Sequence, residues 1–277
     1  MIKQKKLWDN ILTVIMALLC LLWIYPIVLI LLNSLKKEGT FTTSTVFQLP
    51  TSETFAGLSN YVYGVIKMGF LSSLGYSLVI TVSSVALILL CCSMTGWYLT
   101  RVNNKLSKFM NLLIVFSMVV PFQMVMFTLS KTADTLNLNT PWNICIIYLG
   151  FGAGLAVFMF TGFMKSVPME IEEAAMIDGC NKGKAMWHVV IPLMRSSFVQ
   201  CIFLSTTRCF MVYDLNLSLT KGEPFNQSVL AAMHVYNQAF VYKNYGTGQA
   251  EALVLFIVCA VIGMLQVYFG KKGEVAA

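Results

Sequence analysis

The residues best placed to do chemistry in this chain lie in the polar stretch between Lys165 and Arg195. It contains four closely spaced acidic side chains, Glu170, Glu172, Glu173 and Asp178. Ser166 and Pro168 precede them and favour a helix start, because a serine hydroxyl can cap a helix and proline is tolerated in its first turn. The glutamates then lie near the positive end of the helix dipole. No catalytic partner accompanies these acids, so we expect them to form a contact surface.

The spacing of small residues predicts how that surface is built. Four residues fall at i, i+3, i+4 and i+7 and share one helix face: Ile171, Ala174, Ala175 and Asp178. The paired alanines make this face flat enough for close approach. Gly179 stands where a C-terminal cap needs a left-handed residue. We expect a second short helix from Lys182 to Ile191, ended by Pro192.

A second candidate is Arg208, which lies inside an apolar run. A charge facing lipid at mid-depth costs at least about 2.5 kcal/mol, so Arg208 should face the interior of a helix bundle or a water-filled path. Two alternatives remain open. Arg208 is either a residue of a solute pathway, or half of an ion pair with Asp214, Glu251 or a partner subunit.

Other polar side chains at the depth or edge of apolar segments are weaker candidates for the same pathway. They are Gln123, Tyr213, Asp214, Asn216 and Glu251. Each of them could instead form hydrogen bonds between helices of the bundle.

Composition excludes several other kinds of site. Hydrophobic residues make up 57% and charged residues 11% of the chain, and the mean hydropathy is +0.74, whereas soluble chains carry about 25% charged residues. The formal charge of +7 comes from bases scattered among apolar spans, which membrane topology explains better than nucleic-acid binding. The eight cysteines form no CxxC pair, and neither HExxH nor GxxxxGK[ST] occurs. We therefore expect no metal, no cofactor and no catalytic residue.

Long apolar segments must position these residues. We predict one domain over residues 1–277 with six membrane spans, each close to the roughly 20 residues that a bilayer requires. The spans lie at about 11–33, 72–99, 109–129, 141–164, 197–217 and 249–270. The third is interrupted at Pro121, and the glycines between Gly150 and Gly154 favour close helix packing in the fourth.

The distribution of basic residues predicts the orientation. Twelve of the nineteen Lys and Arg residues lie in the terminal segments, in the turn that follows span two, and between spans four and five. Six lie in the alternate loops. Since the richer side is cytoplasmic, both termini and the polar stretch should face the cytoplasm.

At this stretch the sequence resembles a known family. Glu173-Ala174-Ala175, Gly179 and Val189-x-Ile191-Pro192 match the EAA loop of the membrane subunits of bacterial ABC importers, with conservative changes at the two aliphatic positions. Similar segments at 121–123, 136–140, 214–220 and 245–250 extend the resemblance over nearly the whole chain. It resembles the smaller permease subunit of maltose, raffinose or multiple-sugar importers.

The resemblance implies an all-α polytopic permease subunit of a bacterial cell membrane, which imports a di- or oligosaccharide but does not itself hydrolyse ATP. It implies three kinds of protein partner: a second homologous permease, two cytoplasmic ATPase subunits and an extracytoplasmic solute-binding protein. Residues 165–196 then form a coupling loop that passes work from the ATPases to the spans. In that loop Glu173 would meet a basic residue of an ATPase, Ala174 and Ala175 would supply flat contact area, and Asp178, Gly179 and Pro192 complete the site.

Alternatives remain at this point. Glu173 could be a solvated glutamate that only stabilises its own helix. The external loop that contains Glu223, Pro224 and Phe225 could reach a solute-binding protein or serve as a plain connector. The alternative function is a secondary transporter of small solutes, although such proteins place ion-coupling acids at mid-membrane in longer, repeated bundles.

Overall fold

The computed structural model describes residues 2–43, 45–220 and 229–271, and the side chains of residues 2–7 and 271 are not described. Glu223, Pro224 and Phe225 of the predicted external loop lie outside the described residues. So do Lys272 and the side chains of the other lysines that we counted near the termini. The described residues contain no β-strand, and one isolated β-bridge joins Lys36 to Phe55.

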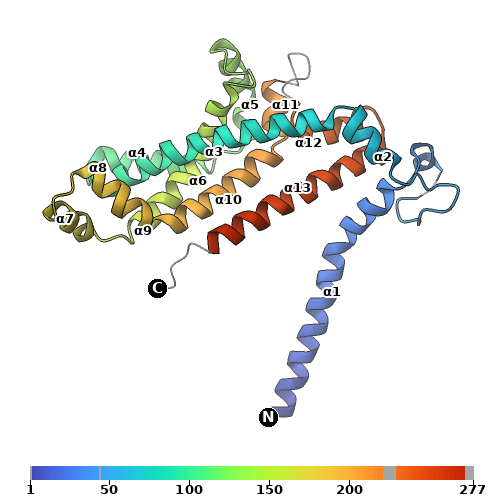
Figure 1. Ribbon diagram of the computed structural model, residues 1–277, viewed down its shortest axis with the longest axis horizontal. Coiled ribbons are helices and arrows are strands. Elements are labelled where there is room, and N and C mark those ends of the chain that lie inside the picture. The colour runs from blue at the N-terminus through green and yellow to red at the C-terminus, as the bar shows by residue number, and fades with distance from the viewer. Residues whose placement is uncertain (1, 44, 221–228, 272–277) are drawn as a thin grey trace. The chain divides into compact units, whose positions relative to one another are not determined.

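The described part of the chain is mostly helical (Figure 1). Its elements are α1 (Ile2–Ser34), η1 (Glu38–Thr42), α2 (Ser59–Tyr61), η2 (Val62–Lys67), α3 (Phe70–Arg101), α4 (Lys105–Ser117), α5 (Phe122–Thr135), α6 (Ile144–Met164), α7 (Met169–Ile177), α8 (Lys182–Ala185), η3 (Met186–Val190), α9 (Ile191–Leu193), α10 (Arg195–Met211), α11 (Asp214–Leu219), α12 (Ala231–Tyr236), η4 (Asn237–Val241) and α13 (Tyr245–Lys271). The predicted all-α polytopic fold is confirmed.

Four described helices are long and apolar enough to cross a membrane: Trp8–Ser34, Phe70–Arg101, Ile144–Met164 and Tyr245–Gly270. Two further spans arise if each of two bent helix pairs crosses as one unit. The pair α4 and α5 bends by 104°, and the run Lys182–Leu193 bends by 70° against α10. The bend of the third span lies at Pro121, where the sequence predicts an interruption. Pro121 has extended backbone between the two helices and disfavours helix in the residue before it. The bend before α10 lies in the predicted loop 165–196, and the predicted fifth span, at about 197–217, is divided after Met211, where α10 ends.

By its contacts the chain divides into two compact units, Met1–Leu71 with His234–Ile257 and Ser72–Met233 with Val258–Ala277. In the first unit, α1 exposes apolar side chains along its length from Trp8 onward. Glu38 accepts hydrogen bonds from the backbone nitrogens of Gly246 (3.0 Å) and Thr247 (2.6 Å). This carboxylate therefore satisfies amides that the first turn of α13 leaves free.

In the second unit α6 is the central helix, because it packs against both α4 and α10 and half of its most apolar window is buried. Two glycines of the predicted run permit close packing: a Cβ atom on Gly152 would lie 2.5 Å from Cδ1 of Ile88 on α3, and one on Gly154 would lie 2.7 Å from Cγ of Met118 at the end of α4. The third, Gly150, has nothing within 4 Å of such an atom. The core of the unit consists of buried apolar residues that include Ile88, Phe160 and Cys201. The helices α3, α4, α6 and α10 thus form the scaffold for the sites described next.

Candidate functional site

The predicted acidic helix exists as α7, which begins at Met169 directly after Pro168. Glu170 and Glu172 lie in its first turn, where the helix dipole favours negative charge. The prediction that the Ser166 hydroxyl caps this helix is wrong. That hydroxyl instead donates to the carbonyl oxygen of Phe163 at 2.6 Å, which ends the preceding helix α6, and the cap residue of α7 is Pro168.

The other end of α7 is closed by Gly179. The backbone nitrogen of Cys180 donates to the carbonyl oxygen of Ala175 (3.0 Å), and that of Gly179 donates to Met176 (3.1 Å). This pair of hydrogen bonds is a Schellman motif, and it requires the left-handed φ of +93° that Gly179 adopts. The expected glycine cap is therefore confirmed, and a side chain at this position would strain the turn.

The predicted contact face of α7 is open to solvent. Glu173, Ala174, Asp178 and Gly179 are exposed, and Ala175 is half-buried. Apolar side chains are also uncovered here, since Ile177 is 86% exposed and Trp187 of η3 is 69% exposed. Because α7 packs directly on α8 and η3, these side chains belong to one loop surface that combines acids, small residues and bare apolar groups.

Pro192 does not end the second loop helix where the sequence pattern placed the break. The helical run continues to Leu193, and the bend of 70° follows it, before α10. The five residues before α9 form the π-helical turn η3, which is the kind of local adjustment that accommodates a proline in a helix. Pro192 itself is exposed.

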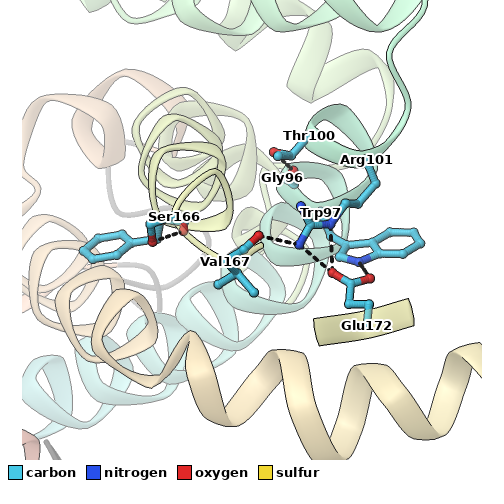
Figure 2. A network of polar contacts seen from close by, with 8 residues as sticks. Gly96, Trp97, Thr100, Arg101, Ser166, Val167 and Glu172 are labelled. Atoms are coloured by element: carbon cyan, nitrogen blue, oxygen red, sulfur yellow. Dashed lines mark hydrogen bonds and ion pairs between the residues drawn. The ribbon is translucent and has the colours of Figure 1, made fainter. Parts of the chain in front are cut away.

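One face of α7 is tied to α3 by a group of polar contacts that we call the Arg101 clamp: Arg101, Trp97, Glu172 and the carbonyl of Val167 (Figure 2). Arg101 reaches Oε1 of Glu172 with Nη2 at 2.6 Å and with Nε at 2.8 Å. Its Nη2 also donates to the carbonyl oxygen of Val167 at 3.0 Å, and Nε1 of Trp97 donates to Oε2 of Glu172 at 3.4 Å. The two charged side chains are only 11% and 12% exposed.

Sequence reasoning missed this clamp. It used Arg101 only to assign the cytoplasmic side, and it treated Glu172 as one of three acids near a helix start. The two residues stand 71 positions apart, so no local pattern connects them. A weak signal was present, because Arg101 ends a long apolar helix and its side chain needs a partner there.

The pathway candidates meet at a cavity of about 460 Å³ in the second unit. Gln123, Arg208, Tyr213 and Asp214 all line it. Aromatic rings supply much of the remaining wall, namely Phe122, Tyr148 and Phe151. The rings of Phe122 and Phe151 meet edge to face, with centroids 5.4 Å apart. The break between α10 and α11 brings Tyr213 and Asp214 to the same hollow as Arg208.

A second cavity, of about 450 Å³, shares the side chains of Phe122, Gln123 and Asp214 with the first. It lies between α5 and α11, where the Ser130 hydroxyl donates to the Ser218 carbonyl oxygen at 2.8 Å. The two hollows adjoin each other and share a wall made of one ring, one amide and one carboxylate.

Within the described residues, Arg208 has neither a hydrogen bond nor an ion pair. An ion pair with Asp214, one of the alternatives that the sequence leaves open, is not formed although both residues line the same cavity. The exposed guanidinium of Arg208 is therefore available to a ligand.

Asn216 and Glu251 are fully buried and line neither of these cavities. In the first unit, Glu251 lies 2.9 Å from Nδ1 of His234, whose Nε2 donates to the Met68 carbonyl oxygen at 3.0 Å. Burial lowers the pKa of His234, but the hydrogen bond and charge of Glu251, together with the Met68 carbonyl, outweigh it and raise that pKa above its ordinary value. Glu251 is thus the partner of a histidine, which sequence reasoning did not foresee.

Comparison with known proteins gives these sites a context. The family of the "Binding-protein-dependent transport system inner membrane component" matches residues 89–273. The probable starch degradation products transport system permease protein AmyC of Thermoanaerobacterium thermosulfurigenes is 34% identical over 189 residues, which cover 68% of each chain.

Two solved structures share the fold. One is a bacterial ABC transporter involved in the import of the acidic polysaccharide alginate, with a TM-score of 0.77 at 19% identity over 96% of this chain and 98% of that chain. The other is a bacterial alginate ABC transporter in complex with its alginate pentasaccharide-bound periplasmic protein, with a TM-score of 0.70 at 13% identity over 99% of each chain. With its long apolar helices, this chain is a multi-pass membrane protein. It belongs to the family of inner membrane components of binding-protein-dependent transport systems.

Proposed function

We propose that this chain is one permease subunit of an ATP-driven importer of di- or oligosaccharides. The observation that carries the proposal is the family match over residues 89–273, which includes the coupling loop with its uncovered outer face. AmyC is named for starch degradation products and both structural neighbours for alginate, so carbohydrate is the shared class of solute.

In this role the outer face of α7 docks on a cytoplasmic ATPase. Glu173 pairs with a basic residue of that partner, and Ala174 and Ala175 allow its surface to approach closely. Asp178, Gly179 and Pro192 set the shape of the loop. The exposed Ile177 and Trp187 support the assignment, because apolar groups rimmed by charged ones mark protein contact sites.

The solute then passes the cavity that contains Arg208. Gln123, Arg208 and Asp214 hydrogen-bond sugar hydroxyls, and Tyr213 offers an aromatic face. A second permease of the same family completes the path, and an extracytoplasmic binding protein delivers the sugar. For Asn216 and Glu251 their burial favours the alternative role of holding helices together. Both termini and the coupling loop face the cytoplasm in this arrangement, in keeping with the excess of Lys and Arg in those segments.

The decisive experiment places a bulky charge on the docking face. We expect Ala174→Arg to abolish uptake of labelled maltotriose, a product of starch breakdown, and to prevent co-purification of an ATPase, while the amount of this chain in the membrane stays unchanged. Asn103→Arg is the matched control, because it adds the same charge at an exposed position between α3 and α4. Undiminished uptake by the Ala174→Arg variant would refute the docking role.

The same assay separates this proposal from a secondary transporter. An importer driven by ATP keeps taking up sugar when a protonophore collapses the proton gradient but cellular ATP is maintained. Uptake by this chain alone, abolished by the protonophore, would favour the secondary transporter.

A further inference from the structure

We propose that Arg101 is a positioning residue that makes α7 and α3 move as one body, so that the work of the ATPase enters the spans through the Arg101–Glu172 pair. This inference rests on the proposed function, because it concerns how a force on the coupling loop travels onward. In this proposal Arg101 and Glu172 act without touching the ATPase.

Apart from the clamp, little holds α7 against α3. The helix is nine residues long and buries none of them, and isolated helices of fewer than about 12 residues are marginal in water. The extended backbone of Pro168 and the left-handed turn at Gly179 flank it. In the part of the chain that the structure describes, every side-chain hydrogen bond from α7 to another helix ends on Arg101 or Trp97.

The clamp is stiff because one guanidinium binds two groups at the start of α7. Arg101 holds both the carboxylate on α7 and the Val167 carbonyl immediately before it, so the helix can neither rotate nor slide without breaking a charge-assisted bond. Such bonds are shorter and stronger than neutral ones. Since both side chains are nearly buried, water and salt screen the pair much less than they screen an exposed pair.

Beyond the clamp, α3 is packed tightly against α6. The helix α3 continues from Arg101 into the core of its unit, where a Cβ atom on Gly96 would lie 2.7 Å from Cβ of Phe160 on α6. About one and a half turns of α3 therefore separate Arg101 from the tight contact of α3 with α6 at Gly96. Because packed helices shift as units rather than deform, a displacement of α7 reaches the central helix of the bundle through Arg101.

Two neighbouring glutamates have different tasks in this scheme. Glu172 faces its own chain and is held by Arg101, whereas Glu173 is exposed and remains available to the partner protein. Docking and transmission should therefore respond to different substitutions.

The first test separates docking from transport in the assembled importer. We expect Arg101→Gln to leave co-purification of the ATPase intact but to lower the number of sugars imported per ATP by about tenfold, within the range of coupling effects that single residues exert. Lys108→Gln, which removes an exposed cation from the first turn of α4, should change neither quantity. An unchanged ratio in Arg101→Gln overturns the proposal, and so does a loss of ATPase binding, which would make Arg101 part of the docking surface.

A charge exchange tests whether the pair itself matters. Arg101→Glu and Glu172→Arg each place like charges together, and the double variant restores an ion pair of reversed sense. We expect the sugar-to-ATP ratio of the double variant to exceed that of either single variant. It should stay below the unmodified ratio, because the Val167 carbonyl loses its donor.

A measurement on the isolated chain does not depend on any ATPase. Nitroxide labels at Tyr98→Cys and Ile177→Cys, both at exposed positions, report the distance between α3 and α7 once the eight native cysteines are replaced. We expect one narrow distance distribution, which Arg101→Gln broadens. A distribution that stays narrow overturns the proposal, whereas an unmodified chain that binds no ATPase overturns only the proposed function.

Discussion

Arg101 and Arg208 belong to the same compact unit, yet their guanidinium groups have different surroundings. Arg101 is 11% exposed and is held by the Glu172 carboxylate and the Val167 carbonyl. Arg208 lines a cavity with Asp214 but, within the described residues, forms no ion pair with it. The guanidinium of Arg101 is thus bound within its own chain, whereas that of Arg208 lines a cavity without such a bond among the described residues.

The difference matches the two roles that we propose for these arginines. A guanidinium that already satisfies a buried carboxylate can bind a ligand only by leaving a charge unpaired, which is expensive. It is therefore suited to transmit force. A guanidinium beside a hollow lined by rings and an amide keeps its donors available for hydroxyl groups, which agrees with the solute pathway that we propose.

The largest expected effect is on stability. We expect Arg101→Leu to lower the free energy of unfolding by about 3 kcal/mol, because it leaves the carboxylate of Glu172 without its cation. Arg208→Leu should change the same quantity by no more than about 0.5 kcal/mol. The midpoint of thermal unfolding of the purified chain in detergent measures both.

A double variant serves as the control for that experiment. Combining Arg101→Leu with Glu172→Leu removes both charges, so it should recover part of the lost stability. Equal unfolding temperatures for the Arg101→Leu and Arg208→Leu variants would show that the two arginines do not differ in their contribution to stability.

Sequence alone predicted the parts of these sites that depend on local rules. The helix α7, its exposed face and the left-handed Gly179 follow from spacing within about ten residues. The packing glycines of α6 follow from their repetition between Gly150 and Gly154 inside an apolar segment. The clamp could not be predicted, since helical periodicity separates the faces of α7 but does not say which face meets Arg101, 71 residues away. The break at Val212 and Tyr213, which brings Tyr213 and Asp214 to the cavity of Arg208, could not be predicted either, because no proline or glycine marks it.

The next effect concerns the shape of the cavity rather than its charge. We expect Gly152→Val to destabilise the chain by about 1–3 kcal/mol, because a Cβ atom there would lie 2.5 Å from Cδ1 of Ile88. Both residues line the cavity, so uptake should fall as well. Gly150→Val is the control, since nothing lies within 4 Å of a Cβ atom at that position, and thermal unfolding with maltotriose uptake distinguishes the two variants.

A smaller effect is expected when the positive charge of Arg208 is removed from the cavity. We expect Arg208→Leu to lower maltotriose uptake about tenfold, equivalent to the roughly 1.4 kcal/mol of one charge-assisted hydrogen bond, with ATPase co-purification unchanged. Arg208→Lys should retain part of the uptake, because it keeps the charge but loses the planar fork. Full uptake by the leucine variant would remove Arg208 from the pathway.

The smallest effect comes from a third cation, whose charge, unlike that of the arginines, depends on pH. The Glu251 carboxylate and the Met68 carbonyl raise the pKa of His234 in the folded chain despite its burial. A group with a raised folded pKa contributes its full stabilisation below its unfolded pKa, near 6.5, and loses it as the pH rises through the folded value. The unfolding temperature of the unmodified chain should therefore fall from pH 6 upward more steeply than that of His234→Gln. Arg101→Leu should keep the steeper slope, because neither member of its ion pair changes charge in this range. Identical slopes in the unmodified chain and His234→Gln would mean that His234 stays neutral beside Glu251.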